Sequence, residues 1–102
     1  MIPVRFEREA QLEYISAGEW YADRDASAKD RFVEEVERTL RAVCSFPAAF
    51  PVVLALRARR PVRRARLRTF PFSLIYVPTP AAIRVLAVAH TSRRPLYWRD
   101  RA

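Results

Sequence analysis

Two stretches in the first half of the chain place apolar side chains every three or four positions, the spacing of one helix face. Residues 7–23 carry one stripe and residues 28–45 the other; the members are Ala10, Tyr14, Ala17 and Tyr21, then Phe32, Val36, Leu40 and Val43. Between them lie Asp25 and Ser27, either of which can cap the following helix. The pattern predicts an antiparallel helical hairpin whose two apolar faces share one core.

The second half of the chain is patterned for three strands. Residues 62–68 alternate in polarity, so Arg64, Arg66 and Arg68 fall on one side of the predicted strand. Residues 70–77 are rich in aromatic and branched side chains, and residues 83–89 are almost wholly apolar, which favours a central position in the sheet. Three such adjacent segments predict an antiparallel meander.

Two shorter segments complete the predicted order. Residues 4–6 alternate as a short first strand, and Pro95 fits the first turn of a short basic C-terminal helix. The three prolines in residues 46–61 predict an ordered connector between the hairpin and the meander. We therefore predict an α+β fold of order β-α-α-β-β-β-α, in which the hairpin packs on one face of a mainly antiparallel sheet.

Composition narrows the class of protein. The length of 102 residues, with 51% hydrophobic residues, predicts a single domain over residues 1–102. One cysteine excludes an internal disulfide, and a charged N-terminal stretch without a long apolar run predicts neither a signal peptide nor a membrane span, so we expect a cytoplasmic protein. One glycine excludes a Gly-rich phosphate loop, and one histidine with one cysteine are too few for a zinc site. We expect no cofactor and no metal.

Positive charge is concentrated in the later part of the chain. The formal net charge is +8, and Lys29 is the only lysine among the basic residues. No carboxylate lies between Glu37 and Asp100, although most of the arginines do. Because a buried unpaired guanidinium is costly, we expect many of these arginines to face solvent or an anionic partner.

The ordered set of segments resembles the RelE/ParE family of bacterial toxins from type II toxin–antitoxin pairs. The resemblance covers nearly the whole chain, and a RelE/ParE-like fold agrees with the predicted order of elements. The segments that carry the resemblance are residues 17–21 (AGEWY), 31–37 (RFVEEVE), 46–47 (FP), 68–76 (RTFPFSLIY), 85–90 (VLAVAH) and 93–98 (RRPLYW).

The family resemblance implies a toxin that arrests growth when it is free of its antitoxin. ParE-like members poison DNA gyrase, and RelE-like members cleave messenger RNA in the decoding site of the ribosome. Both are held inactive by an antitoxin, which we expect to be a small acidic protein in a heterotetramer or larger complex with the toxin. The target is accordingly either gyrase or the ribosome with its mRNA, with no membrane partner. Such pairs also serve plasmid stabilisation.

Candidate site residues follow from the charge pattern and the resemblance together. Surfaces for the target or the antitoxin would use Arg64, Arg66, Arg68, Arg93, Arg94 and Trp98. If the chain were a ribonuclease, the positions that match the family would be His90, Tyr97, Arg68 and Arg93, where His90 has the only side chain that titrates near neutrality. The antitoxin would cover either the strand face with three arginines or the groove of the helical hairpin.

The sequence favours the ParE-like mechanism, but it does not decide whether the chain is an enzyme. No carboxylate that could serve as a base lies between Glu37 and Asp100, and arginine is a poor general base. We therefore favour a gyrase poison over an mRNA endoribonuclease. A third reading is a small Arg-rich nucleic-acid-binding module, in which Phe70, Phe72 or Tyr76 would stack on bases.

Overall fold

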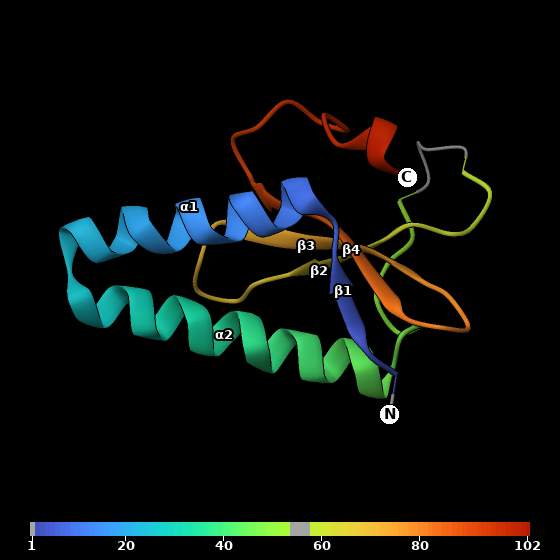
Figure 1. Ribbon diagram of the computed structural model, residues 1–102, viewed down its shortest axis with the longest axis horizontal. Coiled ribbons are helices and arrows are strands. Elements are labelled where there is room, and N and C mark those ends of the chain that lie inside the picture. The colour runs from blue at the N-terminus through green and yellow to red at the C-terminus, as the bar shows by residue number, and fades with distance from the viewer. Residues whose placement is uncertain (1, 54–57) are drawn as a thin grey trace.

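A helical hairpin and a four-stranded sheet make up most of the described part of the protein (Figure 1). The structure, a computed structural model, describes residues 2–53 and 58–102. The elements in chain order are β1 (Val4–Phe6), α1 (Arg8–Arg24), α2 (Ala26–Ser45), β2 (Arg63–Arg66), β3 (Phe72–Pro78), β4 (Ile83–His90) and the 3-10 helix η1 (Arg99–Arg101). The predicted α+β fold is confirmed. Part of the expected connector, residues 54–57 with Arg57, lies outside the described residues.

The turn of the helical hairpin is a single residue. Asp25 caps α2, and its carboxylate accepts a hydrogen bond of 3.0 Å from the backbone N–H of Ser27. Hydrogen bonds from Ser27 hold the pKa of the Asp25 carboxyl below its ordinary value. The helix therefore begins at Ala26, two residues earlier than the apolar stripe alone predicts.

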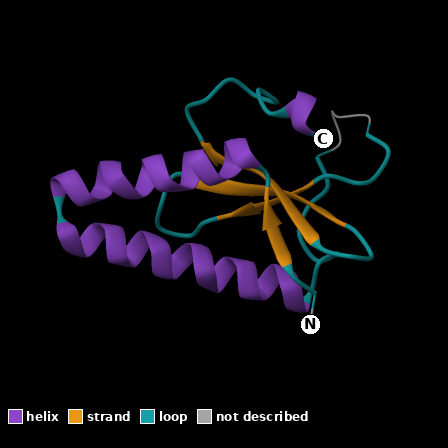
Figure 2. Cartoon of the chain, viewed as in Figure 1, coloured by secondary structure: helices purple, strands orange, loops and turns teal. Residues whose placement is uncertain are grey.

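The strands lie in the order β1-β4-β3-β2. β2, β3 and β4 form the predicted antiparallel meander, and β1 adds to the other edge by pairing parallel with β4. The almost wholly apolar strand β4 is thus internal, as its sequence predicts, while β1 and β2 form the two edges. Both helices lie along one side of this sheet (Figure 2).

Apolar side chains fill both sides of the sheet. On the hairpin side, Phe32 is fully buried and lies within 5.4 Å, between ring centroids, of both Phe70 and Phe72. Tyr76 is also fully buried, and its hydroxyl donates to the carbonyl of Pro47. Phe72 and Tyr76 therefore belong to the core, and the half-buried Phe70 packs against it, so these rings leave little surface for stacking on bases.

A second apolar cluster occupies the opposite side of the sheet and is covered by the C-terminal segment. Trp98 is 2% exposed and packs with Ile75, Leu86 and Ala89. The expected C-terminal helix is shorter than predicted, because only Arg99–Arg101 form a 3-10 turn. Leu96 takes a positive φ of 59°, which breaks a helix from Pro95 and turns Trp98 onto the sheet. Within the described residues no helix is long and apolar enough to cross a bilayer.

Candidate functional site

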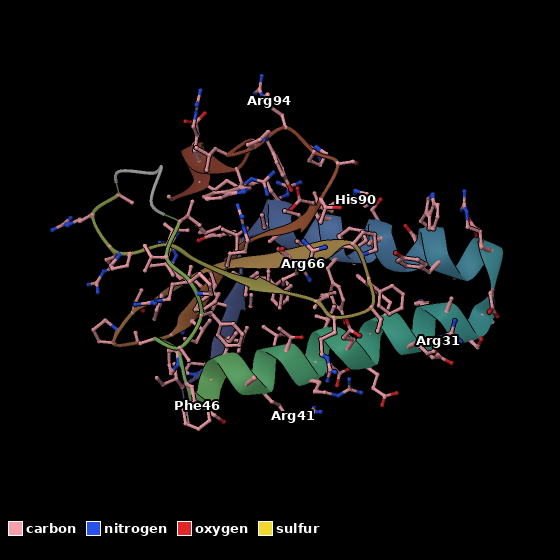
Figure 3. The ribbon with its side chains drawn as sticks, turned by 180° about the vertical axis from the view of Figure 1, so that it is seen from behind. Arg31, Arg41, Phe46, Arg66, His90 and Arg94 are labelled. Carbon is pink, nitrogen blue, oxygen red and sulfur yellow. The ribbon has the colours of Figure 1, made fainter. Side chains whose placement is uncertain are left out.

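Most of the predicted site residues meet in one pocket on the side of the sheet away from the helical hairpin. We call it the arginine pocket; it has a volume of about 280 Å³ and is lined by Arg64, Arg66, Ser73, Ile75, Ala89, His90, Thr91, Arg93, Arg94, Pro95, Leu96, Tyr97 and Trp98. No carboxylate is among these lining residues. Figure 3 shows Arg66 and His90 on this side of the sheet, with Arg94 on the segment beyond it.

Strand register places the arginines of β2 beside small side chains. Arg66 is paired with Ser73 on β3, and Ser73 with Ala89 on β4. Paired residues project from the same face of a sheet, so these three form one row across it. Because Ser73 and Ala89 are short and buried, this row leaves a hollow beside the Arg66 side chain. Arg64 lies two residues earlier and is exposed on the same face.

The C-terminal segment forms the other wall of the arginine pocket. After β4 the chain turns, and the Arg93 N–H donates to the carbonyl of His90 at 3.0 Å. The Arg93 guanidinium carbon lies 3.9 Å from the centre of the Tyr97 ring, a cation–π contact. Trp98 was expected at a binding surface, but it is buried and holds this wall against the sheet.

Arg68 is the one predicted site residue that lies apart from the arginine pocket. The strand ends at Arg66, and Arg68 follows in the connection to β3, outside the lining of the pocket. This connection turns toward α2, where Glu35 accepts hydrogen bonds from the backbone N–H and the hydroxyl of Thr69 at 3.0 and 2.6 Å. The expected face of three arginines is therefore a face of two, extended by Arg93 and Arg94 from the other wall.

His90 ends β4 and has one ring nitrogen already engaged. Its Nδ1 lies 3.0 Å from the backbone N of Ser92 and 2.8 Å from the Ser92 hydroxyl. The backbone N–H can only donate, so Nδ1 accepts and Nε2 carries the proton in the neutral ring. The ring also packs edge-on against Phe72, with centroids 4.9 Å apart. His90 could therefore contribute Nε2–H as a donor to a bound group.

The hydroxyl of Tyr97 is held by a residue that sequence reasoning missed. It donates to Glu13 of α1 at 2.8 Å, and Arg101 donates to the same carboxylate at 3.0 and 3.2 Å. Burial first, and then the hydrogen bond to Glu13, raise the pKa of the Tyr97 phenol well above its ordinary value. The sequence does contain a signal for Glu13: it lies three residues after Ala10 and four before Ala17, on the apolar face of its helix. A carboxylate on that face needs a partner within the protein.

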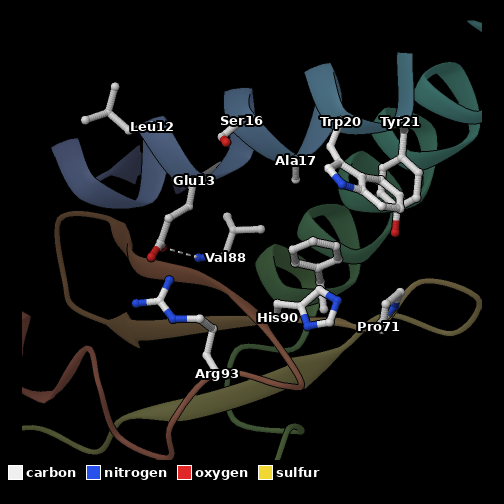
Figure 4. Close-up of a pocket in the computed structure, with 11 residues that line it drawn as sticks. Leu12, Glu13, Ser16, Ala17, Trp20, Tyr21, Pro71, Val88, His90 and Arg93 are labelled. Carbon is white, nitrogen blue, oxygen red and sulfur yellow. Dashed lines mark hydrogen bonds between the residues drawn. The ribbon is translucent and has the colours of Figure 1, made fainter. Parts of the chain in front are cut away.

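A larger and mostly apolar groove runs between α1 and the ends of β3 and β4. This α1 groove has a volume of about 580 Å³ and is lined by Leu12, Glu13, Ser16, Ala17, Trp20, Tyr21, Pro71, Phe72, Val88, His90 and Arg93 (Figure 4). Leu12 is 56% and Trp20 52% exposed, which is unusual for large apolar side chains. His90 and Arg93 line both this groove and the arginine pocket, so the two sites are adjacent.

The comparisons with known proteins agree with this geometry. A family model described as "ParE toxin of type II toxin-antitoxin system, parDE" matches residues 4–95. The chain belongs to the ParE toxin family. The matched range includes all four strands and the four arginines of the pocket, and it ends before the cover formed by Leu96, Tyr97 and Trp98.

A solved structure shares the fold of this ParE-family chain. It is titled "Chromosomal ParDE TA system from P. aeruginosa", has a TM-score of 0.57 and 16% sequence identity, and is matched over 90% of this chain and 98% of that one. A comparison with curated proteins finds no significant match. The family and the shared fold confirm the resemblance drawn from the sequence segments, on its ParE side.

Charge pairing in this ParE-family chain leaves the arginine pocket without internal counterions. Glu7 pairs with Arg84, and Glu9 and Glu13 pair with Arg101. Among the described residues between Glu37 and Asp100, only Arg38 and Arg84 form ion pairs, and Arg63 instead donates to the carbonyls of Ala48 and Phe50. In the part of the chain that the structure describes, no carboxylate forms an ion pair with an arginine of the pocket. In the described ranges no group of His, Cys, Asp and Glu could hold a metal.

Proposed function

We propose that this protein is a toxin that arrests growth by poisoning DNA gyrase and that it acts in the cytoplasm. Membership of the ParE toxin family carries the proposal. The state of the candidate catalytic groups supports it. Tyr97 is bound to Glu13, and the pocket has no carboxylate among its lining residues that could act as a general base.

Two assays on the purified chain separate the targets. In a supercoiling assay, gyrase inhibition or trapping of cleaved DNA is the expected result. In a translation extract, we expect no cleavage of mRNA. His90→Ala and Tyr97→Phe should leave gyrase inhibition largely intact, since neither side chain performs a chemical step in this proposal. Discrete cuts in the mRNA at codon spacing that appear with the unmodified protein and disappear with both variants would contradict the gyrase proposal.

A ribosome-dependent endoribonuclease is the second candidate, and one observation favours it. The arginine pocket gathers His90, Tyr97 and Arg93 beside three further arginines, and these named residues are three of the four that RNA cleavage was expected to use. In that reaction the 2′-hydroxyl would attack the neighbouring phosphate and displace the 5′-oxygen, while the arginines stabilise the charge on the phosphate and the His90 Nε2–H hydrogen-bonds to it. The ribosome or water would accept the 2′-hydroxyl proton and supply the proton that the leaving oxygen takes up. The same translation extract tests this candidate.

The partner of the toxin is an antitoxin, and we propose that it occupies the α1 groove. The groove offers exposed Leu12 and Trp20 to apolar side chains of the partner, while Arg93 at its edge suits an acidic one. Trp20 already carries the Arg24 guanidinium 3.4 Å above its ring, which adds a second positive group at this rim. An acidic amphipathic segment fits such a surface.

Antitoxin binding can be tested with one tryptophan and one pair of arginines. Expression of the chain alone should arrest growth, and co-expression with the product of the adjacent antitoxin gene should restore it. Trp20→Ala should weaken the complex by at least about 2 kcal/mol, because the partner would cover this half-exposed ring and the variant removes it. Charge reversal at Arg64 and Arg66 should weaken it much less, measured by calorimetry. The opposite order would place the antitoxin on the arginine pocket.

A further inference from the structure

The arginine pocket is built to receive negative charge from outside the protein. Arg64, Arg66, Arg93 and Arg94 are all exposed, and none of the four forms an ion pair with any carboxylate that the structure describes. Four like charges around one hollow repel one another, and the contact of Arg93 with the Tyr97 ring offsets this repulsion for one of the four only. Their gathering at one site therefore calls for a ligand that carries several negative charges.

The shape of the arginine pocket indicates the kind of anion. Its floor of Ser73 and Ala89 gives a hollow of about 280 Å³, which admits phosphate groups between guanidinium forks but not a stack of bases. Guanidinium groups bind phosphate oxygens in pairs, with a geometry that fixes the bound group. His90 adds a ring N–H at the edge of the same hollow.

Two observations favour a nucleic-acid duplex over a peptide or a single strand. The apolar floor of the arginine pocket, Ile75, Ala89 and Trp98, is buried, so a peptide would find charge there but only the rim of Pro95, Leu96 and Tyr97 for apolar contact. Single-stranded nucleic acid is usually held by stacking on exposed aromatic rings, and the Tyr97 ring is already covered by Arg93. What remains is contact with a backbone of closely spaced phosphates, and duplex DNA has the highest density of them.

We propose that Arg64, Arg66, Arg93 and Arg94 form a binding site for the phosphate backbone of double-stranded DNA. The site reads no sequence, because it offers phosphate contacts and no element that enters a groove. The DNA-binding site itself stands on the pocket geometry. The role of this site in the cell, contact with the DNA that gyrase holds, rests on the proposed function.

Duplex binding by the 102-residue chain, released from its antitoxin, tests this site. The probe is a fluorescently labelled DNA duplex of arbitrary sequence, read by anisotropy as salt is raised. Four phosphate contacts give a slope of log affinity against log salt of about −3.6, so affinity should fall about 100-fold between 50 and 200 mM salt. In Arg64→Gln/Arg66→Gln the slope should drop to about −1.8 and the fall to about tenfold.

A matched control removes the same charge from elsewhere on the surface. Arg41 on α2 and Arg59 in the connector are exposed and lie outside the arginine pocket. Arg41→Gln/Arg59→Gln should keep the salt slope of the unmodified chain and lose less than about threefold in affinity, since net charge alone acts weakly at a distance. Arg93 is left unchanged in both variants, because it also faces Glu13 across the α1 groove (Figure 4).

Each outcome decides for or against the site. A reduced slope in the pocket variant alone supports it, whereas equal losses in the two double variants overturn it. Tighter binding of single-stranded RNA of the same length overturns it and favours the ribonuclease. Gyrase supercoiling is measured on the same samples: inhibition without pocket-dependent DNA binding defeats only the DNA site, and pocket-dependent DNA binding without gyrase inhibition defeats only the proposed function.

Discussion

The two sides of the sheet differ in whether their charged side chains have partners within the protein. On the hairpin side the one buried carboxylate, Glu35, is 5% exposed and accepts hydrogen bonds from Thr69 within the described chain. On the other side Arg64 and Arg66 have no such partner within the described chain. The buried charge on the hairpin side is therefore met within the protein, whereas the arginines of the pocket are open to a ligand.

The α1 groove and the arginine pocket extend this contrast to binding. The groove exposes Leu12 and Trp20 and suits a protein partner, whereas the pocket exposes guanidinium groups and suits phosphate. His90 and Arg93 line both, so an antitoxin in the groove would bury part of the pocket wall. Neutralising a toxin through its groove can thereby also close its anion site.

The largest expected effect compares the two tryptophans of the chain. Trp98→Ala should lower the free energy of unfolding by about 3–5 kcal/mol, because it removes a buried ring from the second apolar cluster. Trp20→Ala should cost less than about 1 kcal/mol, because its ring is half exposed and contacts mainly Tyr21 and Arg24. Urea denaturation measures both. Equal losses would mean that the C-terminal cover contributes little to the fold.

The next effect tests what holds the C-terminal cover to α1. Glu13→Gln leaves Arg101 without its closest counterion and should cost about 2 kcal/mol, less than a fully buried pair because both side chains are 18% exposed. The pKa of the Tyr97 phenol should fall toward its ordinary value, although burial keeps it raised. Ultraviolet titration, with Tyr97→Phe to identify that phenol, measures the shift. An unchanged titration would show that Glu13 does not bind Tyr97 in solution.

Much of the fold could be predicted because local patterns and tertiary packing agree. The helical stripe with Phe32 and Val36 gives α2 one face that must be buried. The almost wholly apolar strand of residues 83–89 must be buried on both faces. The C-terminal segment was harder, because its conformation is set by distant residues. Trp98 docks on the sheet and Glu13 binds Tyr97 and Arg101, and neither contact leaves a local pattern.

The candidate site shows the same division. Alternation in β2 placed Arg64 and Arg66 on one face, but the strand ends before Arg68, which periodicity alone does not reveal. The pairing of β3 with both β2 and β4 places the end of β4 near Arg64 and Arg66. His90, Arg93 and Arg94 reach the pocket only through this long-range pairing, which the sequence does not show. The α1 groove was not predicted, because the exposure of Leu12 and Trp20 depends on how α1 packs on the sheet and leaves no local pattern in the sequence.

A smaller effect concerns acid stability on the hairpin side. Burial raises the pKa of Glu35, but hydrogen bonds from the side chain and backbone of Thr69 outweigh it, so the pKa is lowered from its ordinary value of 4.5. A lowered pKa in the folded state stabilises the protein above the unfolded pKa, and this contribution is lost as the pH falls through the folded one. Glu35→Gln should cost about 1 kcal/mol at neutral pH and flatten the acid decline. Glu34→Gln, on the exposed side of α2, should leave the decline unchanged in urea titrations at several pH values.

The smallest expected effect is the sharpest test of the contrast between the two sides of the sheet. If Arg64 and Arg66 had a structural role, their replacement would destabilise the protein. Arg64→Gln/Arg66→Gln removes two exposed cations that have no ion pair in the described chain, so its free energy of unfolding should rise by a few tenths of a kcal/mol, about 0.3, through reduced repulsion. Because exposed charges are screened by salt, this gain should vanish at about 1 M ionic strength. A loss of more than about 1 kcal/mol would mean that these arginines help to hold the sheet together, and the surface would then be structural after all.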